Sequence, residues 1–159
     1  MELMDALSQA MKLETDGHTF YLGMVELVED EGGKAMFRQL AADEMDHLHY
    51  IERQYDALQA GGGWSAIPEM NAVENIDAVS LVFPPEKEVL KELPENPTEE
   101  DALLFAMGVE DQSFKLYYKS AQIAKDAEAK KLFMQLAGAE QVHFNILMQR
   151  FESRYPYPR

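Results

Sequence analysis

The sequence predicts an all-α protein, a bundle of four helices arranged as two helical hairpins. Three observations support this prediction. Apolar residues recur at helical spacing in four segments, a connection rich in glycine and proline separates the second segment from the third, and the two halves repeat each other at a fixed offset. The chain has 159 residues, of which 47% are hydrophobic, enough to build a buried core. We therefore expect a single domain over residues 1–159.

The first hairpin is predicted in residues 3–59. Residues 3–30 contain no proline and carry Leu7, Met11 and Val25 at helical spacing, which predicts the first helix. Residues 30–33, Asp-Glu-Gly-Gly, are typical of a turn. The apolar pattern resumes at Lys34 and continues to about Gln59, which predicts the second helix.

Residues 60–97 are predicted to form a long connection. The stretch opens with three glycines, contains the only tryptophan, Trp64, and has four of the seven prolines near its end. One short helix is expected around Glu86–Leu93. A connection of this length can run along a bundle and join the second and third helices in parallel, which fits a ferritin-like topology.

The second hairpin is predicted after Pro97. Thr98, followed three residues later by Asp101, indicates a helix N-terminus, and the third helix is expected to reach about Lys125. The fourth helix is predicted from about Ala127 to Glu152. Residues 155–158, Tyr-Pro-Tyr-Pro, are expected to form a loose tail or part of an interface.

The charge balance excludes several classes of function. The formal net charge is −15, from 29 acidic and 14 basic residues, so the chain should repel nucleic acid and anionic membranes and attract cations. The absence of cysteine excludes disulfides, zinc–thiolate sites and iron–sulfur ligation. No targeting segment or membrane-spanning run is evident, and we expect a cytoplasmic protein.

Residues 10–56 align with residues 106–152 without a gap at an offset of 96. Twelve of the 47 positions are identical, which indicates a pseudo-two-fold internal repeat. The apolar identities say only that two similar hairpins pack together. The polar identities are more informative, because each hairpin has a glutamate on its first helix and Glu-x-x-His on its second. The identical polar pairs relevant to a site are Glu14/Glu110, Glu44/Glu140 and His47/His143.

These six residues predict a metal site. Positions i and i+3 of a helix share a face, so each Glu-x-x-His pair can reach one centre, and the glutamates of the facing helices would complete it. Four carboxylates and two imidazoles are the donor set of ferritin-like di-iron and di-manganese bundles. The four negative charges balance two divalent cations, whereas burying them without a cation would be costly. The predicted ligands are Glu14, Glu44, His47, Glu110, Glu140 and His143.

Three further side chains lie near these predicted ligands. Tyr21 and Tyr117 each follow a first-helix glutamate by seven residues, so a phenol could hydrogen-bond a ligating carboxylate; the alternative is an ordinary core side chain. His18 lies one turn from Glu14, but its repeat mate is Phe114, which favours a packing role over a seventh ligand.

In these residues and their spacing, the chain resembles the ferritin-like domain of the rubrerythrin family over nearly its whole length. The resemblance rests on Glu14 with Tyr21, on residues 40–47, on Glu110 with Tyr117 and on residues 136–143. It implies a non-haem centre of two iron ions, bridged by the second-helix glutamates, with the other four residues as terminal ligands. It also implies reduction of hydrogen peroxide or dioxygen with electrons from a rubredoxin-like iron centre.

Two departures from the family pattern affect this expectation. The cysteine-ligated rubredoxin domain is missing, so electrons would have to come from a separate electron-donor protein. Peroxidase members also carry an extra glutamate one turn after the third-helix ligand, where this chain has Ser113. In those members the glutamate captures an iron ion that moves during turnover, so the resemblance does not imply this iron movement for a chain with Ser113.

The sequence leaves three functions open. The chain could be a di-iron oxidoreductase acting on peroxide, dioxygen or Fe(II), an iron-binding or sequestration protein, or a structural module stabilised by metal. Manganese or a mixed metal pair would suit the same donors. We expect a homodimer, in which the long connection could also allow hairpins to be exchanged between chains.

Overall fold

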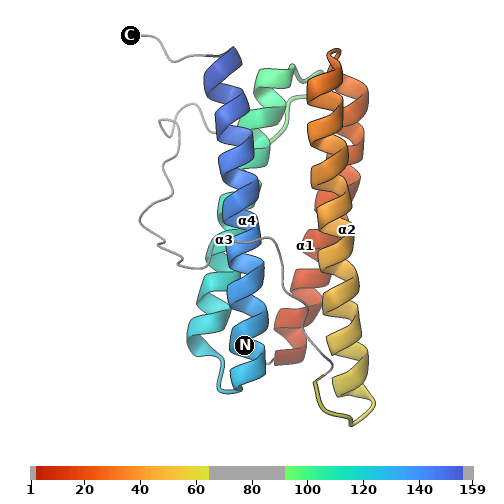
Figure 1. Cartoon of the computed structure of the whole chain (residues 1–159), viewed down its shortest axis with the longest axis vertical. Coiled ribbons are helices and arrows are strands. Elements are labelled where there is room, and N and C mark those ends of the chain that lie inside the picture. Colours follow the sequence, from red (N-terminus) through yellow and green to blue (C-terminus); the bar gives the residue numbers. More distant parts are fainter. Residues whose placement is uncertain (1–2, 65–91, 156–159) are drawn as a thin grey trace. The chain divides into compact units, whose positions relative to one another are not determined.

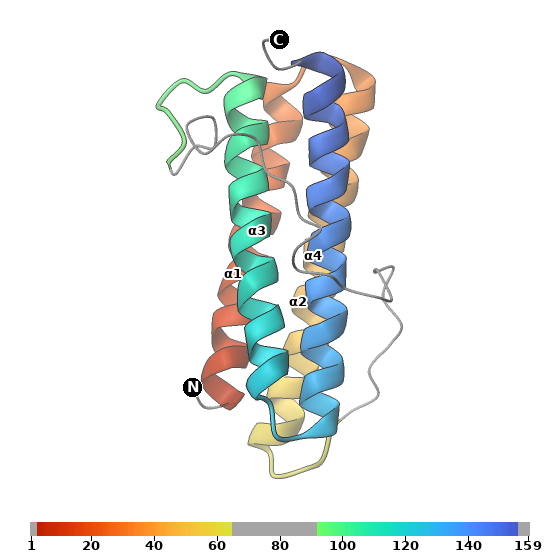
Figure 2. The same ribbon diagram turned by 90° about the vertical axis from the view of Figure 1, so that its left-hand side faces the viewer.

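The computed structural model describes residues 3–64 and 92–155. These residues form four α-helices: α1 (Leu3–Leu27), α2 (Glu31–Gln59), α3 (Glu99–Ile123) and α4 (Ala127–Arg154). No strand occurs among the described residues, and none of their helices combines the length and the apolar character needed to cross a membrane. The structure thus confirms an all-α protein with two helical hairpins (Figures 1 and 2).

The chain divides into two compact units, Met1–Glu69 with Ile123–Leu132, and Met70–Gln122 with Phe133–Arg159. In the first unit, α1 and α2 lie side by side and run in opposite directions (Figure 1). The second unit contains α3 up to Gln122 and the part of α4 that begins at Phe133. Whether the units act as one domain stays a prediction.

The start of α2 differs from the turn predicted at residues 30–33. Asp30 is the N-cap, and its carboxylate accepts a hydrogen bond of 2.9 Å from the backbone N–H of Gly33. The two glycines therefore lie inside the first helical turn, where this acceptor satisfies a donor that the helix itself cannot. As a result, α1 ends at Leu27 rather than at residue 30, and α2 begins at Glu31 rather than Lys34.

The predicted end of α2 at Gln59 is confirmed, and the backbone explains it. Gly61 has a φ of 81°, a left-handed conformation that glycine adopts without strain. The N–H of Gly62 donates to the carbonyl of Ala57, and the N–H of Gly61 donates to that of Leu58. These two bonds are the Schellman pattern, which ends a helix by pairing its last carbonyls.

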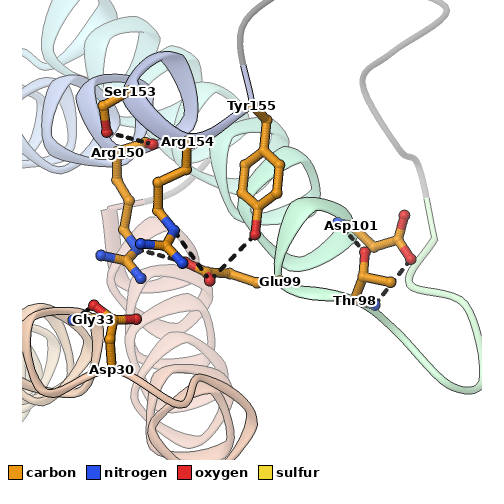
Figure 3. A network of polar contacts seen from close by, with 9 residues as sticks. All are labelled: Asp30, Gly33, Thr98, Glu99, Asp101, Arg150, Ser153, Arg154 and Tyr155. Atoms are coloured by element: carbon orange, nitrogen blue, oxygen red, sulfur yellow. Dashed lines mark hydrogen bonds and ion pairs between the residues drawn. The ribbon is translucent and has the colours of Figure 1, made fainter.

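The predicted N-terminus of the third helix is also confirmed. Thr98 Oγ1 accepts a hydrogen bond from the N–H of Asp101, and the Asp101 carboxylate accepts one from the N–H of Thr98, each 3.1 Å long (Figure 3). This reciprocal arrangement is a capping box with aspartate in the place of the usual glutamate. The connection therefore ends where the sequence predicts, at the boundary of α3. Most of the short helix predicted around Glu86–Leu93 lies outside the described residues, as does the tail after Tyr155.

Glu99, in the first turn of α3, links α3 to the end of α4 within the second unit. Its carboxylate forms ion pairs with Arg150 and with Arg154 (3.6 Å), and accepts a hydrogen bond of 3.3 Å from the Tyr155 hydroxyl (Figure 3). The Arg150 and Glu99 side chains are largely buried, so this contact is better shielded from water than an ordinary surface ion pair.

The core of each unit is built from the apolar stripes that the sequence predicts. Large side chains are removed from water almost completely, and each contributes roughly 1.5–3 kcal/mol to folding. Leu22 is an exception among the residues with helical spacing, because 47% of its surface is exposed. The principal buried side chains are Leu7, Tyr21, Phe37, Leu40 and Ile51 in the first unit, and Leu103, Met107, Phe114, Tyr117, Phe133, Leu136, Phe144, Leu147 and Phe151 in the second.

Candidate metal centre

The first unit contains a buried cluster of Glu14, Glu44 and His47, which we call the N-terminal cluster. Glu14 comes from α1, and the other two residues come from one face of α2. One ligand atom of each residue lies within 4.8 Å of the ligand atoms of the other two. His47 Nδ1 lies 3.5 Å from Glu14 Oε2, and the Glu14 side chain is fully removed from solvent. Two carboxylates and one imidazole thus converge inside this hairpin.

The second unit contains the equivalent C-terminal cluster of Glu110, Glu140 and His143. Glu110 comes from α3 and the other two from α4, and one ligand atom of each again lies within 4.8 Å of the others. His143 Nδ1 lies 3.5 Å from Glu110 Oε1 and 3.6 Å from Glu140 Oε2. All three residues are buried. The side chains that helical spacing groups together therefore lie close to one another within each hairpin.

The local geometry of the two hairpins matches across the repeat. The histidine-to-glutamate distance is 3.5 Å in both clusters. Tyr21 stacks on Phe37 with ring centroids 6.0 Å apart, and Tyr117 stacks on Phe133 at 6.4 Å. The caps also correspond: like Asp30 before α2, Asp126 precedes α4 and accepts a hydrogen bond of 2.8 Å from Glu128 N–H. The identities at offset 96 therefore encode equivalent structures, beyond a shared apolar pattern.

Burial disturbs the protonation of the C-terminal cluster. The pKa of Glu110 is raised from 4.5 to about 8, mainly by removal from water and second by the negative charge of Glu140, while His143 acts in the opposite direction. Without a cation, Glu110 therefore holds a proton at neutral pH. A bound metal ion would supply the positive charge that favours the ionised carboxylate. The donor set and its electrostatics both fit a cation, and each cluster could hold a metal ion.

Other residues considered from the sequence lie close to the clusters in the chain. Tyr21 and Tyr117 are both buried against aromatic rings, as a core role requires, and their predicted hydrogen bonds to ligating carboxylates stay predictions. His18 Nδ1 lies 2.8 Å from the carbonyl oxygen of Ala41. Because a carbonyl can only accept, Nδ1 carries the proton, which makes this nitrogen unsuited to binding a metal.

Gly17 is a residue that the sequence argument missed. It lies on α1 one turn after Glu14, and a Cβ atom built on it would lie 3.1 Å from Glu44 Oε2. The signal was present in the repeat, because the mate of Gly17 is Ser113, the position already singled out by comparison with peroxidase sequences. The two hairpins therefore differ in side chain at this position, with glycine in one and serine in the other.

Comparisons with known proteins agree with the four-helix fold described above. A family model described as rubrerythrin matches residues 5–151. The structure is similar to that of a hypothetical protein from Pyrococcus furiosus, with a TM-score of 0.67 and 23% sequence identity over 96% of this chain and 89% of that one. No curated protein matches the chain. The family match and the helices confirm the predicted class, an all-α protein of the ferritin-like four-helix-bundle type.

Proposed function

Because the chain belongs to the rubrerythrin family, we propose that it is a non-haem di-iron oxidoreductase that reduces hydrogen peroxide or dioxygen. The observation that carries the proposal is the presence, in each hairpin, of a buried cluster of two glutamates and one histidine. Carboxylates and imidazoles suit iron, manganese and other first-row ions, whereas burying so many acidic groups without a cation is unfavourable.

We assign two metal ions to the residues of the N-terminal and C-terminal clusters. The side chains that would hold them are Glu14, Glu44, His47, Glu110, Glu140 and His143. Two divalent ions would neutralise the four carboxylates, which removes the electrostatic penalty of burying them. Iron bound there would supply the two electrons that reduction of peroxide requires.

The chain's own side chains have three tasks in this proposal. The glutamates and histidines hold the ions and orient them. The surrounding apolar side chains keep bulk water away from the cluster, which strengthens the electrostatic interactions within it. The Tyr21 and Tyr117 hydroxyls would hydrogen-bond ligating carboxylates and hold them in place. We also propose that electrons come from a separate donor protein. We further propose that the protein acts in the cytoplasm as a homodimer.

Iron handling is the second candidate function, and the net charge of −15 favours it because an acidic protein attracts Fe(II). In this case iron would be oxidised or retained without repeated turnover. A purely structural role for the metal is the third candidate. All three require bound metal, and they differ in what happens when an oxidant is added.

The test is a peroxide-consumption assay on iron-loaded protein with an excess of an external reductant. An oxidoreductase should consume many equivalents of peroxide per centre, a sequestering protein about one equivalent, and a structural module none. Glu110→Gln should abolish consumption by removing a proposed ligand, whereas Glu100→Gln, at an exposed position on the same helix, should leave it unchanged. A wild-type protein that binds iron but does not turn over would contradict the proposal.

A further inference from the structure

Helix α1 passes unusually close to the carboxylate of Glu44, and it does so at Gly17. A Cβ atom added there would lie 3.1 Å from Glu44 Oε2, 3.3 Å from Cδ and 3.5 Å from Cγ. Ordinary van der Waals contacts of a Cβ atom lie between 3.4 and 4 Å, so the distances to Oε2 and Cδ are both too short. Any side chain at this position would require the Glu44 carboxylate to move by a few tenths of an ångström.

The presence of glycine here needs an explanation, because Gly17 is in the interior of a helix of 25 residues. Glycine in a helix interior costs roughly 1 kcal/mol relative to alanine, since it loses more backbone freedom on folding. Gly23 on the same helix is exposed, and a Cβ added there would meet nothing within 4 Å. The close approach to Glu44 is therefore specific to Gly17 and not a general property of glycines in α1.

The carboxylate of Glu44 has little freedom to move without changing the cluster. The residue is only 3% exposed, and one of its oxygens lies within 4.8 Å of ligand atoms of Glu14 and His47. A displacement away from α1 would change its position relative to both partners. We propose that Gly17 is a positioning residue for metal binding: its missing side chain lets the Glu44 carboxylate lie against α1 in the N-terminal cluster. This inference rests on the proposed metal centre.

The repeat strengthens the inference. The two hairpins agree in their histidine-to-glutamate distance, their tyrosine stacks and their helix caps, but Gly17 corresponds to Ser113. Ser113 is buried and carries a side chain one turn after Glu110, so a side chain is accepted at the equivalent place in the other hairpin. The requirement for glycine therefore belongs to the N-terminal cluster alone, and Gly17→Ser introduces the residue that the repeat already contains.

The experiment compares Gly17→Ala and Gly17→Ser with the matched controls Gly23→Ala and Gly23→Ser. Anaerobic Fe(II) binding is measured by titration calorimetry, and urea unfolding is followed with and without Fe(II). We expect both Gly17 variants to lose about 10–100-fold in Fe(II) affinity, the range found when groups that support metal ligands are altered. The Gly23 variants should bind like the wild type.

The unfolding data separate a positioning role from a packing role. Without metal, Gly17→Ala should be at least as stable as the wild type, because alanine favours the helix and an unligated carboxylate can shift. The stabilisation that Fe(II) provides should shrink only in the Gly17 variants. Wild-type Fe(II) affinity in Gly17→Ala would overturn the inference and leave the proposed centre intact. Failure of the wild type to bind Fe(II) would overturn both.

Discussion

Glu110 gives the metal-free protein a pH dependence that runs opposite to that of most acidic groups. Its pKa is raised from 4.5 to about 8, first by burial and second by the charge of Glu140. The folded protein therefore binds a proton that the unfolded chain releases between these two values. The contribution of Glu110 to the free energy of unfolding is fully present below pH 4.5 and is lost as the pH rises through 8. At higher pH the buried carboxylate must either ionise or be exposed to water.

The size of the effect follows from the two pKa values. At about 1.4 kcal/mol per unit of pKa, the change from 4.5 to about 8 corresponds to a loss on the order of 5 kcal/mol across this pH range. Small domains have total stabilities of roughly 5–15 kcal/mol, so the loss should be easily measured. The assay is urea unfolding of chelator-treated protein at intervals between pH 5 and 8.5, with the free energy of unfolding extrapolated to water.

Two comparisons isolate the contribution of Glu110. Glu110→Gln removes the ionisable group at nearly the same volume, so the free energy of unfolding should depend less on pH. Glu100→Gln, at an exposed position on the same helix, should leave the pH dependence unchanged. Saturating divalent metal should reverse the slope, because metal and proton compete for the same carboxylates. A metal-free wild-type protein whose stability does not fall between pH 5 and 8.5 would refute the reasoning, as would an unchanged slope in Glu110→Gln.

Three further predictions concern groups outside this titration. Glu99→Ala should destabilise the protein by about 2 kcal/mol in urea unfolding, because it removes the acceptor of a largely buried ion pair, whereas Glu100→Ala should have little effect; equal effects would contradict the shielding argument. Asp30→Ala should cost about 1 kcal/mol in the same assay through loss of the α2 cap, and an unchanged midpoint would refute that role. Tyr21→Phe and Tyr117→Phe keep the stacked rings, so they should weaken Fe(II) binding measured by calorimetry without loss of stability; unchanged affinity would support a core role alone.

The sequence predicted most of the helical architecture because its signals are local. The end of α2 follows from glycines that adopt a left-handed turn, and the start of α3 follows from Thr98 and Asp101, which satisfy each other's backbone N–H groups. The start of α2 was predicted wrongly because two adjacent glycines resemble a turn. In the structure, the Asp30 carboxylate holds those glycines in the helix.

The members of each cluster were also predictable, since positions i and i+3 share a helix face and the repeat links each pair to a glutamate on the preceding helix. The repeat singles out the position of Gly17, but the close approach of α1 to Glu44 at this residue was not predictable from spacing. The distance between α1 and the Glu44 side chain is set by the packing of the whole hairpin. The pKa of Glu110 likewise depends on burial and on the position of Glu140, which no spacing rule provides.

The most direct test of the central claim is the metal content of protein purified from its native source, determined by elemental analysis. The proposed centre predicts two iron ions per chain, held by Glu14, Glu44, His47, Glu110, Glu140 and His143. Glu14→Gln combined with Glu110→Gln should remove both ions, while the exposed pair Glu26→Gln and Glu100→Gln should retain them. Protein that contains two zinc ions would contradict the redox function, because zinc has no redox chemistry, and protein without metal would contradict the centre itself.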